Sequence, residues 1–260
     1  MLPIRNYSYS ELGKDISFLL ERYPFLDCRV IGRSVCGREI YCLSLGEWRQ
    51  DVASTIYTAA FHGMEWITSW VLMSFIEEIF KNFSLLTPRF SLHFIPMVNP
   101  DGVEMAVAGK RWQANANGVD INHNFPAEWQ AVKSAPSFSR FGGHSHCSEP
   151  ETIAIMQYTR KTNPSRIFAL HSQGEEIYWD FDGKGDRGYA EELAAVSGYR
   201  VANPEPLASF GGYKDWFIDE FGRAGYTIEV GKGTNPLPLS SFEDTYKKIL
   251  LALKMSVNHK

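Results

Sequence analysis

The sequence predicts a single α/β domain with a mixed, mostly parallel sheet and helices on both faces. Short apolar segments alternate with longer segments of helical periodicity, which is typical of strands connected by crossover helices. The length of 260 residues fits one large α/β domain, and no repeat, low-complexity tract or Pro/Gly/Ser-rich linker divides it. We therefore expect residues 1–260 to form one domain.

The first segments are predicted to form a helix and two strands. Residues 9–23 carry apolar side chains at helical spacing, and Pro24 ends this helix. Residues 29–31 and 40–45 have the short apolar pattern of strands, and glycines mark a turn between them. The N-terminal helix is therefore followed by a strand pair.

A buried strand and a long helix are predicted next. Residues 56–61 form an apolar run that ends at His62. Residues 66–80 follow with one apolar face, which predicts a helix. Residues 92–98 predict another strand, and the Asn-Pro-Asp-Gly sequence at 99–102 predicts the turn that ends it.

The second half continues the alternation. Ser148 as N-cap, Pro150 in the first turn and Glu151 three residues after the cap have the spacing of a capping box, which predicts a helix start. Two further apolar strands and a last helix are predicted at residues 167–170, 226–230 and 242–255. The first of these strands ends at His171 and the second at Gly231.

Composition and charge exclude several classes of function. The chain has 26 Lys and Arg against 30 Asp and Glu, a net charge of −4, which argues against a nucleic-acid partner. The N-terminus has no apolar signal segment, and no run approaches the roughly 20 apolar residues that span a bilayer. The four cysteines lack CxxC spacing and are expected to be reduced thiols. We expect a cytoplasmic protein with no membrane partner; nothing in the sequence indicates an oligomeric state.

Side chains capable of chemistry follow the ends of four predicted strands. His62, the turn at 99–102, His171 and Glu229 each lie at or just after such an end. In open α/β sheets, ligands bind in the crevice outside the carboxyl ends of the strands. These four segments are therefore expected to meet in one cleft.

A metal site is predicted within this cleft. His62 and Glu65 are three residues apart, so a turn or helix start brings both to one side. His171, at the end of another strand, is the best candidate for a third ligand, and two histidines with one glutamate form a known catalytic zinc set. The sequence offers a rival cluster at 144–147 in a glycine-rich loop, whereas His93 lies inside an apolar strand and is expected to be a core residue.

Seven motifs in order carry a family resemblance over nearly the whole chain. They are Gly-Arg-Ser at 32–34 with Gly-Arg-Glu-Ile at 37–40, His-Gly-Met-Glu at 62–65, Asn-Pro-Asp-Gly at 99–102, Gly-Val-Asp-Ile-Asn-His-Asn-Phe at 118–125, Ser-Glu-Pro-Glu-Thr at 148–152, Leu-His-Ser at 170–172 and Thr-Ile-Glu at 227–229. In these motifs the chain resembles the zinc carboxypeptidase (carboxypeptidase A/T) superfamily. It is most similar to the bacterial γ-D-glutamyl-L-diamino-acid (meso-diaminopimelate) peptidases at residues 112–125, 171–179 and 210–217.

The resemblance implies a role for each matched residue. His62, Glu65 and His171 would hold one zinc ion. Asp120 would fix the tautomer of a zinc-bound histidine, and Glu229 would be the general base that takes a proton from the attacking water. Arg111, the nearest suitable cation before the motif at 118–125, would stabilise the oxyanion. Asn122 would bind the carboxylate of the leaving residue.

Three positions depart from the pattern of most members. His123 stands where many have arginine, so carboxylate capture is expected to be weaker and pH-sensitive; this replacement is a feature of the diaminopimelate-peptidase branch. The family's mobile substrate-binding tyrosine has no clear counterpart, and Tyr178 or Tyr213 could substitute for it. Lys214 occupies the specificity position, where it is either a solvated surface residue or the partner of the distal carboxylate of diaminopimelate.

Aromatic residues make up 14% of the chain, and the motifs suggest two locations for them. Trp66, Trp70, Phe75 and Phe80 lie on or beside the helix behind His62 and are expected in the core. Others flank the motifs of the cleft: Trp112, Phe125, Tyr178, Trp179, Phe210, Tyr213, Trp216 and Phe217.

These observations predict a zinc-dependent peptidase that hydrolyses the γ-D-glutamyl–meso-diaminopimelate bond of muropeptides such as L-Ala-γ-D-Glu-meso-diaminopimelate. Two alternatives on the same fold are a general zinc carboxypeptidase that releases C-terminal residues and a zinc deacylase acting on N-acyl amino acids. An alternative from another class is a non-catalytic muropeptide-binding sensor. The expected partner in each peptidase reading is a small peptide or muropeptide.

Overall fold

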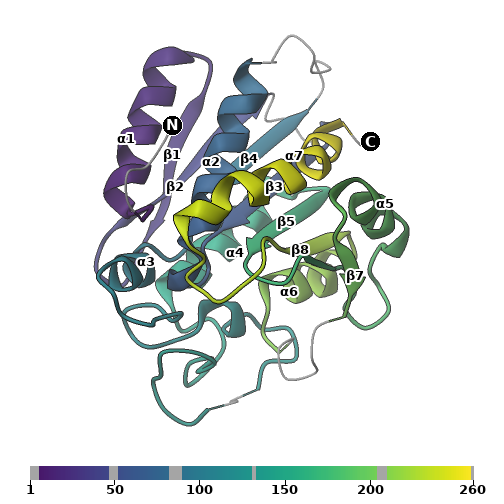
Figure 1. Cartoon of the computed structure of the whole chain (residues 1–260). Helices are drawn as coiled ribbons and strands as arrows, with labels where there is room; N and C mark the ends of the chain where they lie inside the picture. Colours follow the sequence, from purple (N-terminus) through teal and green to yellow (C-terminus); the bar gives the residue numbers. More distant parts are fainter. Residues whose placement is uncertain (1–5, 47–51, 82–89, 131–132, 204–209, 259–260) are drawn as a thin grey trace.

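An eight-stranded mixed sheet runs through the molecule (Figure 1). The computed structural model describes residues 6–46, 52–81, 90–130, 133–203 and 210–258. The strands are β1 (Asp27–Arg33), β2 (Glu39–Gly46), β3 (Ser54–Ala59), β4 (Ser91–Ile95), β5 (Arg166–His171), β6 (Glu176–Tyr178), β7 (Arg200–Ala202) and β8 (Gly225–Glu229). Their order across the sheet is β1-β2-β4-β3-β5-β8-β6-β7. The predicted α/β class with a mixed sheet is confirmed.

The middle of the sheet is parallel, and its margins are mixed. Strand β3 pairs in parallel with β4 and β5, and β5 pairs in parallel with β8. Antiparallel pairings join β1 to β2, β2 to β4, and β6 to β8, whereas β7 is parallel to β6. The carboxyl ends of β3, β4, β5 and β8 therefore lie along one edge.

Helices cover both faces of the sheet. The helices are α1 (Tyr9–Arg22), α2 (Trp66–Lys81), α3 (Pro100–Val107), α4 (Pro150–Thr162), α5 (Arg187–Ser197), α6 (Tyr213–Phe221) and α7 (Phe242–Asn258), and the described 3₁₀ turns are η1 (Gly63–Glu65), η3 (Ile121–His123) and η5 (Leu239–Ser241). Helices α1, α2, α5 and α7 contribute to one apolar core, and α4 and α6 contribute to the other. Figure 1 shows α2 and α7 in front of the sheet and α4 behind it.

The central strands are buried on both faces, so their side chains alternate between the two cores. Tyr57 and Phe168 belong to the core under α2 and α7, and Ile56 and Ala169 belong to the core under α4 and α6. Such strands appear in sequence as continuous apolar runs, which is why they could be predicted. Two buried layers hold the strand ends rigidly at one edge.

Several predicted elements differ in detail from the structure. The strand predicted at 92–98 ends at Ile95. The predicted turn at 99–102 is the start of α3, whose N-cap Asn99 accepts a hydrogen bond from the Gly102 backbone N–H at 2.9 Å. The predicted capping box is wrong: Glu149 is the N-cap of α4 and caps it without its side chain. Glu151 is turned into the protein instead of reaching back to Ser148.

A buried carboxylate network fixes the turn between β1 and β2. Asp101 accepts hydrogen bonds from Ser34 Oγ at 2.9 Å and from the Cys36 backbone N–H at 2.8 Å. Glu151, in the first turn of α4, accepts one from the Val35 backbone N–H at 3.0 Å. Burial raises the pKa of Glu151 to about 7. The turn is thereby attached to both α3 and α4.

The expectations for cysteine and histidine in the core hold. All four cysteines are free thiols. His93 is fully buried, with Nε2 2.9 Å from Ser91 Oγ and Nδ1 2.8 Å from the Tyr158 hydroxyl. Burial lowers the pKa of His93 to about 4, so this ring is neutral at physiological pH.

Aromatic side chains are concentrated in the core more than the motifs suggested. Those expected behind His62 are buried as predicted: Trp66, Trp70, Phe75 and Phe80. Four of those expected at the cleft are buried within the core under α4 and α6: Phe125, Tyr213, Trp216 and Phe217. In the described part of the chain, no helix is long and apolar enough to cross a membrane.

Candidate active site

Three neighbouring strands place three side chains at one edge of the sheet. His171 is the last residue of β5, and Glu229 is the last residue of β8, and the two residues are paired across the strands. Strand β3, on the other side of β5, ends at Ala59 and leads to His62. The strand order brings these three residues together as expected, but the fourth expected segment, residues 99–102, does not line the cleft, and its Asp101 binds the β1–β2 turn instead.

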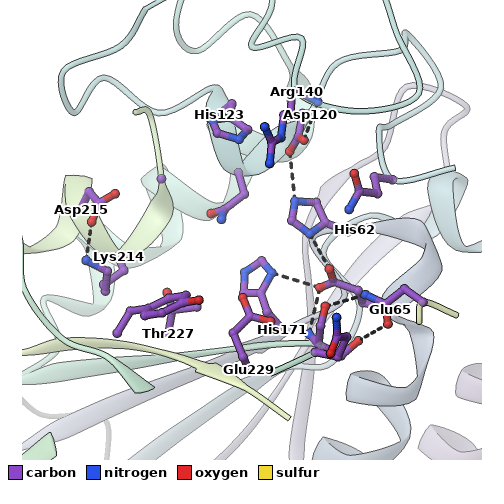
Figure 2. Close-up of a pocket in the computed structure, with 17 residues that line it drawn as sticks. His62, Glu65, Asp120, His123, Arg140, His171, Lys214, Asp215, Thr227 and Glu229 are labelled. Carbon is purple, nitrogen blue, oxygen red and sulfur yellow. Dashed lines mark hydrogen bonds and ion pairs between the residues drawn. The ribbon is translucent and has the colours of Figure 1, made fainter. Parts of the chain in front are cut away.

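The 3₁₀ turn η1 brings Glu65 between the two histidines. His62 precedes this turn, and Glu65 is its last residue. Glu65 Oε1 lies 2.8 Å from His62 Nδ1, and Glu65 Oε2 lies 3.0 Å from His171 Nδ1 (Figure 2). One donor atom from each of the three residues lies within 4.8 Å of the others. The three side chains could therefore coordinate a single metal ion.

Asp120 orients His62 from the other side of its ring. Asp120 Oδ1 is 3.1 Å from His62 Nε2, and Asp120 Oδ2 accepts a hydrogen bond from the Arg140 backbone N–H at 2.8 Å. A proton on Nε2 that is donated to this carboxylate leaves the Nδ1 lone pair directed at the metal position. Asp120 therefore selects the tautomer that a metal ligand requires.

The electrostatics of the cluster keep its carboxylates charged. Although burial opposes it, the neighbouring His62 and His171 lower the pKa of Glu65 to about 2. Burial also opposes ionisation of Asp120, but His62 and His123 hold its pKa below the usual range. Burial acts against protonation of His62, yet Glu65 and Asp120 raise its pKa well above the usual value. The negative charges of Glu65 and Asp120 therefore stabilise a positive charge placed between them.

The donor set fits zinc. Two imidazole nitrogens and one carboxylate are ligands that zinc accepts in catalytic sites, where a fourth position stays open. His171 Nε2 is buried, and no hydrogen-bond partner for it occurs among the described residues. His171 Nδ1 lies 3.0 Å from Glu65 Oε2, so Nδ1 is the nitrogen that His171 directs at the metal position.

Glu229 stands beside this cluster as a potential base. It lines the same cleft as His62, Glu65 and His171. Burial first, and then the negative charge of Glu65, raise the pKa of Glu229 well above the usual value. A carboxylate with a raised pKa is suited to accept and return a proton during hydrolysis.

The cleft has a volume of about 360 Å³ and collects nine of the ten residues predicted from the sequence. These are His62, Glu65, Asp120, Asn122, His123, His171, Tyr178, Lys214 and Glu229. Figure 2 shows Lys214 and Asp215 across the cleft from His62. The metal cluster and the specificity position therefore share one cavity.

Lys214 is buried and not a solvated surface residue. Its side chain lines the cleft, and the residue is only 4% exposed. Nζ forms an ion pair with Asp215 and donates a hydrogen bond to the Asp180 carbonyl oxygen at 2.5 Å. The surface alternative for this residue is wrong.

Two polar side chains of η3 face the same cavity. Asn122 Oδ1 accepts a hydrogen bond from the Tyr213 backbone N–H at 3.1 Å, which leaves its amide nitrogen available to a ligand. His123 Nδ1 lies 2.8 Å from the Phe210 carbonyl oxygen. Tyr178 is also in the lining, and its hydroxyl donates to Glu176 Oε2 at 2.6 Å.

Arg111 is not brought to the cleft. It is exposed and does not line the cavity, whereas Gln113, two residues later, does. The Gln113 carbonyl oxygen accepts a hydrogen bond from the Gly63 backbone N–H at 2.9 Å, which places Gln113 next to η1. Because the loop before the motif at 118–125 is short, the sequence alone did not show that Gln113, and not Arg111, reaches the cleft.

Several residues of the cleft were not predicted from the sequence. They are Gln113, Arg140, Ser172, Gln173, Asp215, Thr227 and Asn235. Ser172, Gln173, Asp215 and Thr227 lie inside or beside recognised motifs, so adjacency could have suggested them. Arg140 lies in a segment without regular helix or strand, and no sequence signal pointed to it.

The rival cluster of the sequence does not form a metal site. His144 and His146 are exposed, and His146 Nδ1 lies 3.5 Å from Cys147 Sγ. Among the residues that the structure describes, the only group of three or more His, Cys, Asp or Glu side chains able to hold a metal is His62 with Glu65 and His171.

Comparisons with known proteins agree with this geometry. A family model described as zinc carboxypeptidase matches residues 14–252. The chain is 35% identical to gamma-D-glutamyl-L-diamino acid endopeptidase 1 of Lysinibacillus sphaericus, covering 95% of this chain and 71% of that protein. The structure is similar to bovine thrombin-activatable fibrinolysis inhibitor, with a TM-score of 0.83, 20% identity and 97% coverage of both chains. It is also similar to murein-tripeptide amidase of Escherichia coli O157, with a TM-score of 0.65, 24% identity and coverage of 90% and 92%.

Proposed function

The chain belongs to the zinc carboxypeptidase family, and we propose that it hydrolyses the bond between γ-D-glutamate and meso-diaminopimelate in cell-wall peptides. It is a metallopeptidase that uses one zinc ion, for which His62, Glu65 and His171 are the proposed ligands. We assign the whole activity to a single catalytic domain. The relative from Lysinibacillus sphaericus supports the γ-D-glutamyl bond as the target.

Each of the cleft residues named below has a separate role in amide hydrolysis. When bound, zinc would polarise the scissile carbonyl and lower the pKa of water at the open coordination position. Glu229 takes a proton from the attacking water as the new C–O bond forms, and returns it to the nitrogen as the C–N bond breaks. Asp120 holds His62 in the required tautomer throughout. No covalent enzyme intermediate is needed.

One observation carries the choice of substrate: a buried pair of opposite charges lies in the cleft wall. Lys214 and Asp215 are 4% and 3% exposed, and they form an ion pair beside the cavity. The distal end of meso-diaminopimelate carries an ammonium and a carboxylate on one carbon. In the proposed complex the substrate carboxylate meets Lys214 and the substrate ammonium meets Asp215, so no charge is left unpaired.

The Lys214–Asp215 pair discriminates between a substrate that contains diaminopimelate and one that contains lysine. The lysine side chain ends in an ammonium alone, which would meet Lys214 without a carboxylate to offset the repulsion. An apolar residue would leave the Lys214–Asp215 pair without hydrogen-bonding partners from the substrate. The pair therefore favours the diaminopimelate peptidase over a general carboxypeptidase.

The proposed activity is tested by mass spectrometry of zinc-loaded protein with L-Ala-γ-D-Glu-meso-diaminopimelate. We expect release of free diaminopimelate and L-Ala-γ-D-Glu. The lysine analogue and an N-benzoylglycyl dipeptide are run beside it. Faster hydrolysis of either comparison substrate than of the diaminopimelate tripeptide would contradict the proposal, and turnover of none would indicate a binding protein.

The role of the charge pair is tested by its neutral replacement. The double variant Lys214→Met with Asp215→Asn removes both charges together, so neither is left buried alone. We expect kcat/KM to fall about 10- to 100-fold for the diaminopimelate tripeptide and far less for the lysine analogue. An equal fall for both substrates would contradict recognition of the distal amino-acid group. Zinc content and melting temperature provide the folding control.

A further inference from the structure

The described lining of the cleft contains one lysine and one arginine, and only the lysine is neutralised by the protein. Lys214 is paired with Asp215. Arg140 is exposed and lines the cavity, and no ion pair of its guanidinium occurs among the described residues. Figure 2 shows Arg140 between His123 and Asp120 at the rim of the cavity. A positive charge is therefore available to an anionic group of the substrate.

The backbone around Arg140 is fixed even though its side chain is exposed. Its φ of 61° lies in the left-handed region, which an arginine adopts only when surrounding contacts hold it there. Its N–H donates to Asp120 Oδ2 at 2.8 Å, and the next residue, Phe141, accepts a hydrogen bond from the Asp120 N–H at 2.7 Å through its carbonyl oxygen. Asp120, which orients His62, thus also fixes the backbone position of Arg140.

His123 does not offer a hydrogen to the cavity in its neutral form. Its Nδ1 lies 2.8 Å from the Phe210 carbonyl oxygen, which can only accept a hydrogen bond, so the ring hydrogen resides on Nδ1. Nε2 then carries a lone pair, which repels a carboxylate oxygen. His123 consequently packs beside the anion position without supplying the charge that an arginine would supply.

Asn122 offers a hydrogen-bond donor to the same cavity. Because its Oδ1 is occupied by the Tyr213 backbone N–H, its amide nitrogen is the group left for a ligand. An amide donor alone binds a carboxylate weakly in water, whereas a guanidinium adds a permanent charge and paired N–H groups. Asn122 and Arg140 together supply both.

We propose that Arg140, together with Asn122, binds the free α-carboxylate of the residue released by cleavage. The guanidinium comes from the segment before the 142–143 glycines and replaces the charge that His123 lacks. Since the chain carries a net charge of −4, this local cation attracts an anionic peptide that the overall field repels. The proposal deepens and rests on the proposed peptidase function.

The test measures binding in a background that does not turn over substrate. Glu229→Gln protein is titrated calorimetrically with L-Ala-γ-D-Glu-meso-diaminopimelate and with the same tripeptide whose released α-carboxylate is a carboxamide. Arg140→Gln is then added to this background, and Lys110→Gln removes one exposed positive charge outside the cavity lining as the matched control. Arg140→Gln keeps the backbone N–H to Asp120, so zinc content is expected to stay at one ion per chain.

We expect Arg140→Gln to raise the Kd of the free acid about 10- to 100-fold and to leave the Kd of the carboxamide unchanged. Lys110→Gln should leave both unchanged. Equal weakening of both ligands, or no weakening of the acid, would overturn the assignment. Turnover is measured separately for Arg140→Gln in the otherwise wild-type protein. If this change lowers turnover but leaves both Kd values in the Glu229→Gln background unchanged, Arg140 acts on the transition state, and the assignment is overturned.

The failure of this proposal is distinguishable from failure of the proposed function. Turnover of the tripeptide by wild-type protein tests the function, independently of the Arg140 contrast. If the tripeptide is not a substrate, the same acid and carboxamide contrast is measured with N-benzoylglycyl dipeptides, because every peptide cut next to its last residue carries the same free carboxylate. A contrast there supports Arg140, and its absence rejects Arg140.

Discussion

At the residue scale, the chemistry of this protein depends on which atoms of a few side chains are already occupied. His62 Nε2 contacts Asp120, and His123 Nδ1 contacts a backbone carbonyl oxygen. Asn122 Oδ1 accepts a hydrogen bond from a backbone N–H. Each contact leaves one defined atom for the metal or the substrate. The residue types and the Asp120 contact could be predicted from the sequence, but the partners of His123 and Asn122 could not, because these are backbone groups distant in the chain.

Glu229→Gln is expected to retain zinc and to lose activity by about 10²- to 10⁴-fold, because the amide cannot accept the proton of the attacking water. The measurement is kcat/KM for the tripeptide together with zinc content. Glu192→Gln is the control, because Glu192 lies on an exposed position of α5 outside the cavity lining and its replacement should leave activity near that of wild type. Activity retained in Glu229→Gln would contradict the assigned role.

At the element scale, η1 is the piece of structure on which the metal cluster depends. The turn packs against α3 and the loop that contains Gln113, and its closeness to both requires a residue without a side chain at Gly63. A Cβ at Gly63 would lie 2.2 Å from the Gly102 carbonyl oxygen and 2.8 Å from the Trp112 carbonyl oxygen. These are backbone atoms, so neither neighbour can move away by rotating a side chain.

Gly63→Ala is therefore expected to displace η1, to weaken zinc binding and to lower the free energy of unfolding by about 1–3 kcal/mol. Gly13→Ala is the matched control in α1, where an added Cβ meets nothing within 4 Å. That change should raise the free energy of unfolding by about 0.5–1 kcal/mol. Urea denaturation and zinc analysis of both variants decide the matter, and equal behaviour of the two would refute the packing argument.

The elements that could be predicted share a physical reason. Strands β3, β5 and β8 are buried on both faces and appear as apolar runs, so their ends, and with them His62, His171 and Glu229, could be located. Strands β6 and β7 are three residues each and too short to leave a periodic pattern. Their absence from the prediction left one margin of the sheet undescribed.

At the scale of the whole molecule, the metal centre and part of the cleft wall could be predicted, while the rest of the wall could not. The ligands follow strand ends that the fold places together, and this rule is general to α/β sheets. The unpredicted part of the wall includes loop residues such as Gln113 and Arg140, and the approach of these loops to the cleft depends on the full tertiary structure. Arg140, inside the cleft, and Arg111, outside it, show the difference, because nothing in the local sequence distinguishes the two.

The buried carboxylate that attaches α4 to the β1–β2 turn couples folding to proton uptake. Glu151 is inaccessible to solvent, and burial raises its pKa to about 7, against about 4.3 for an unfolded glutamate. Between these values the folded protein holds a proton that the unfolded chain releases, so this group makes stability fall as pH rises from about 4.5 to 7, after which its contribution is constant. The loss amounts to at most about 4 kcal/mol.

Glu151→Gln should remove this slope. The difference in unfolding free energy between the variant and wild type, both loaded with zinc, should shift in favour of the variant from pH 5 to 7.5. Glu192→Gln, on an exposed position of α5, controls for the loss of one negative charge. A difference that stays flat with pH would show that Glu151 is charged in the folded protein throughout. If the slope is found, Glu151 beside the β1–β2 turn takes up a proton when the protein folds, and mild acidity favours the folded protein.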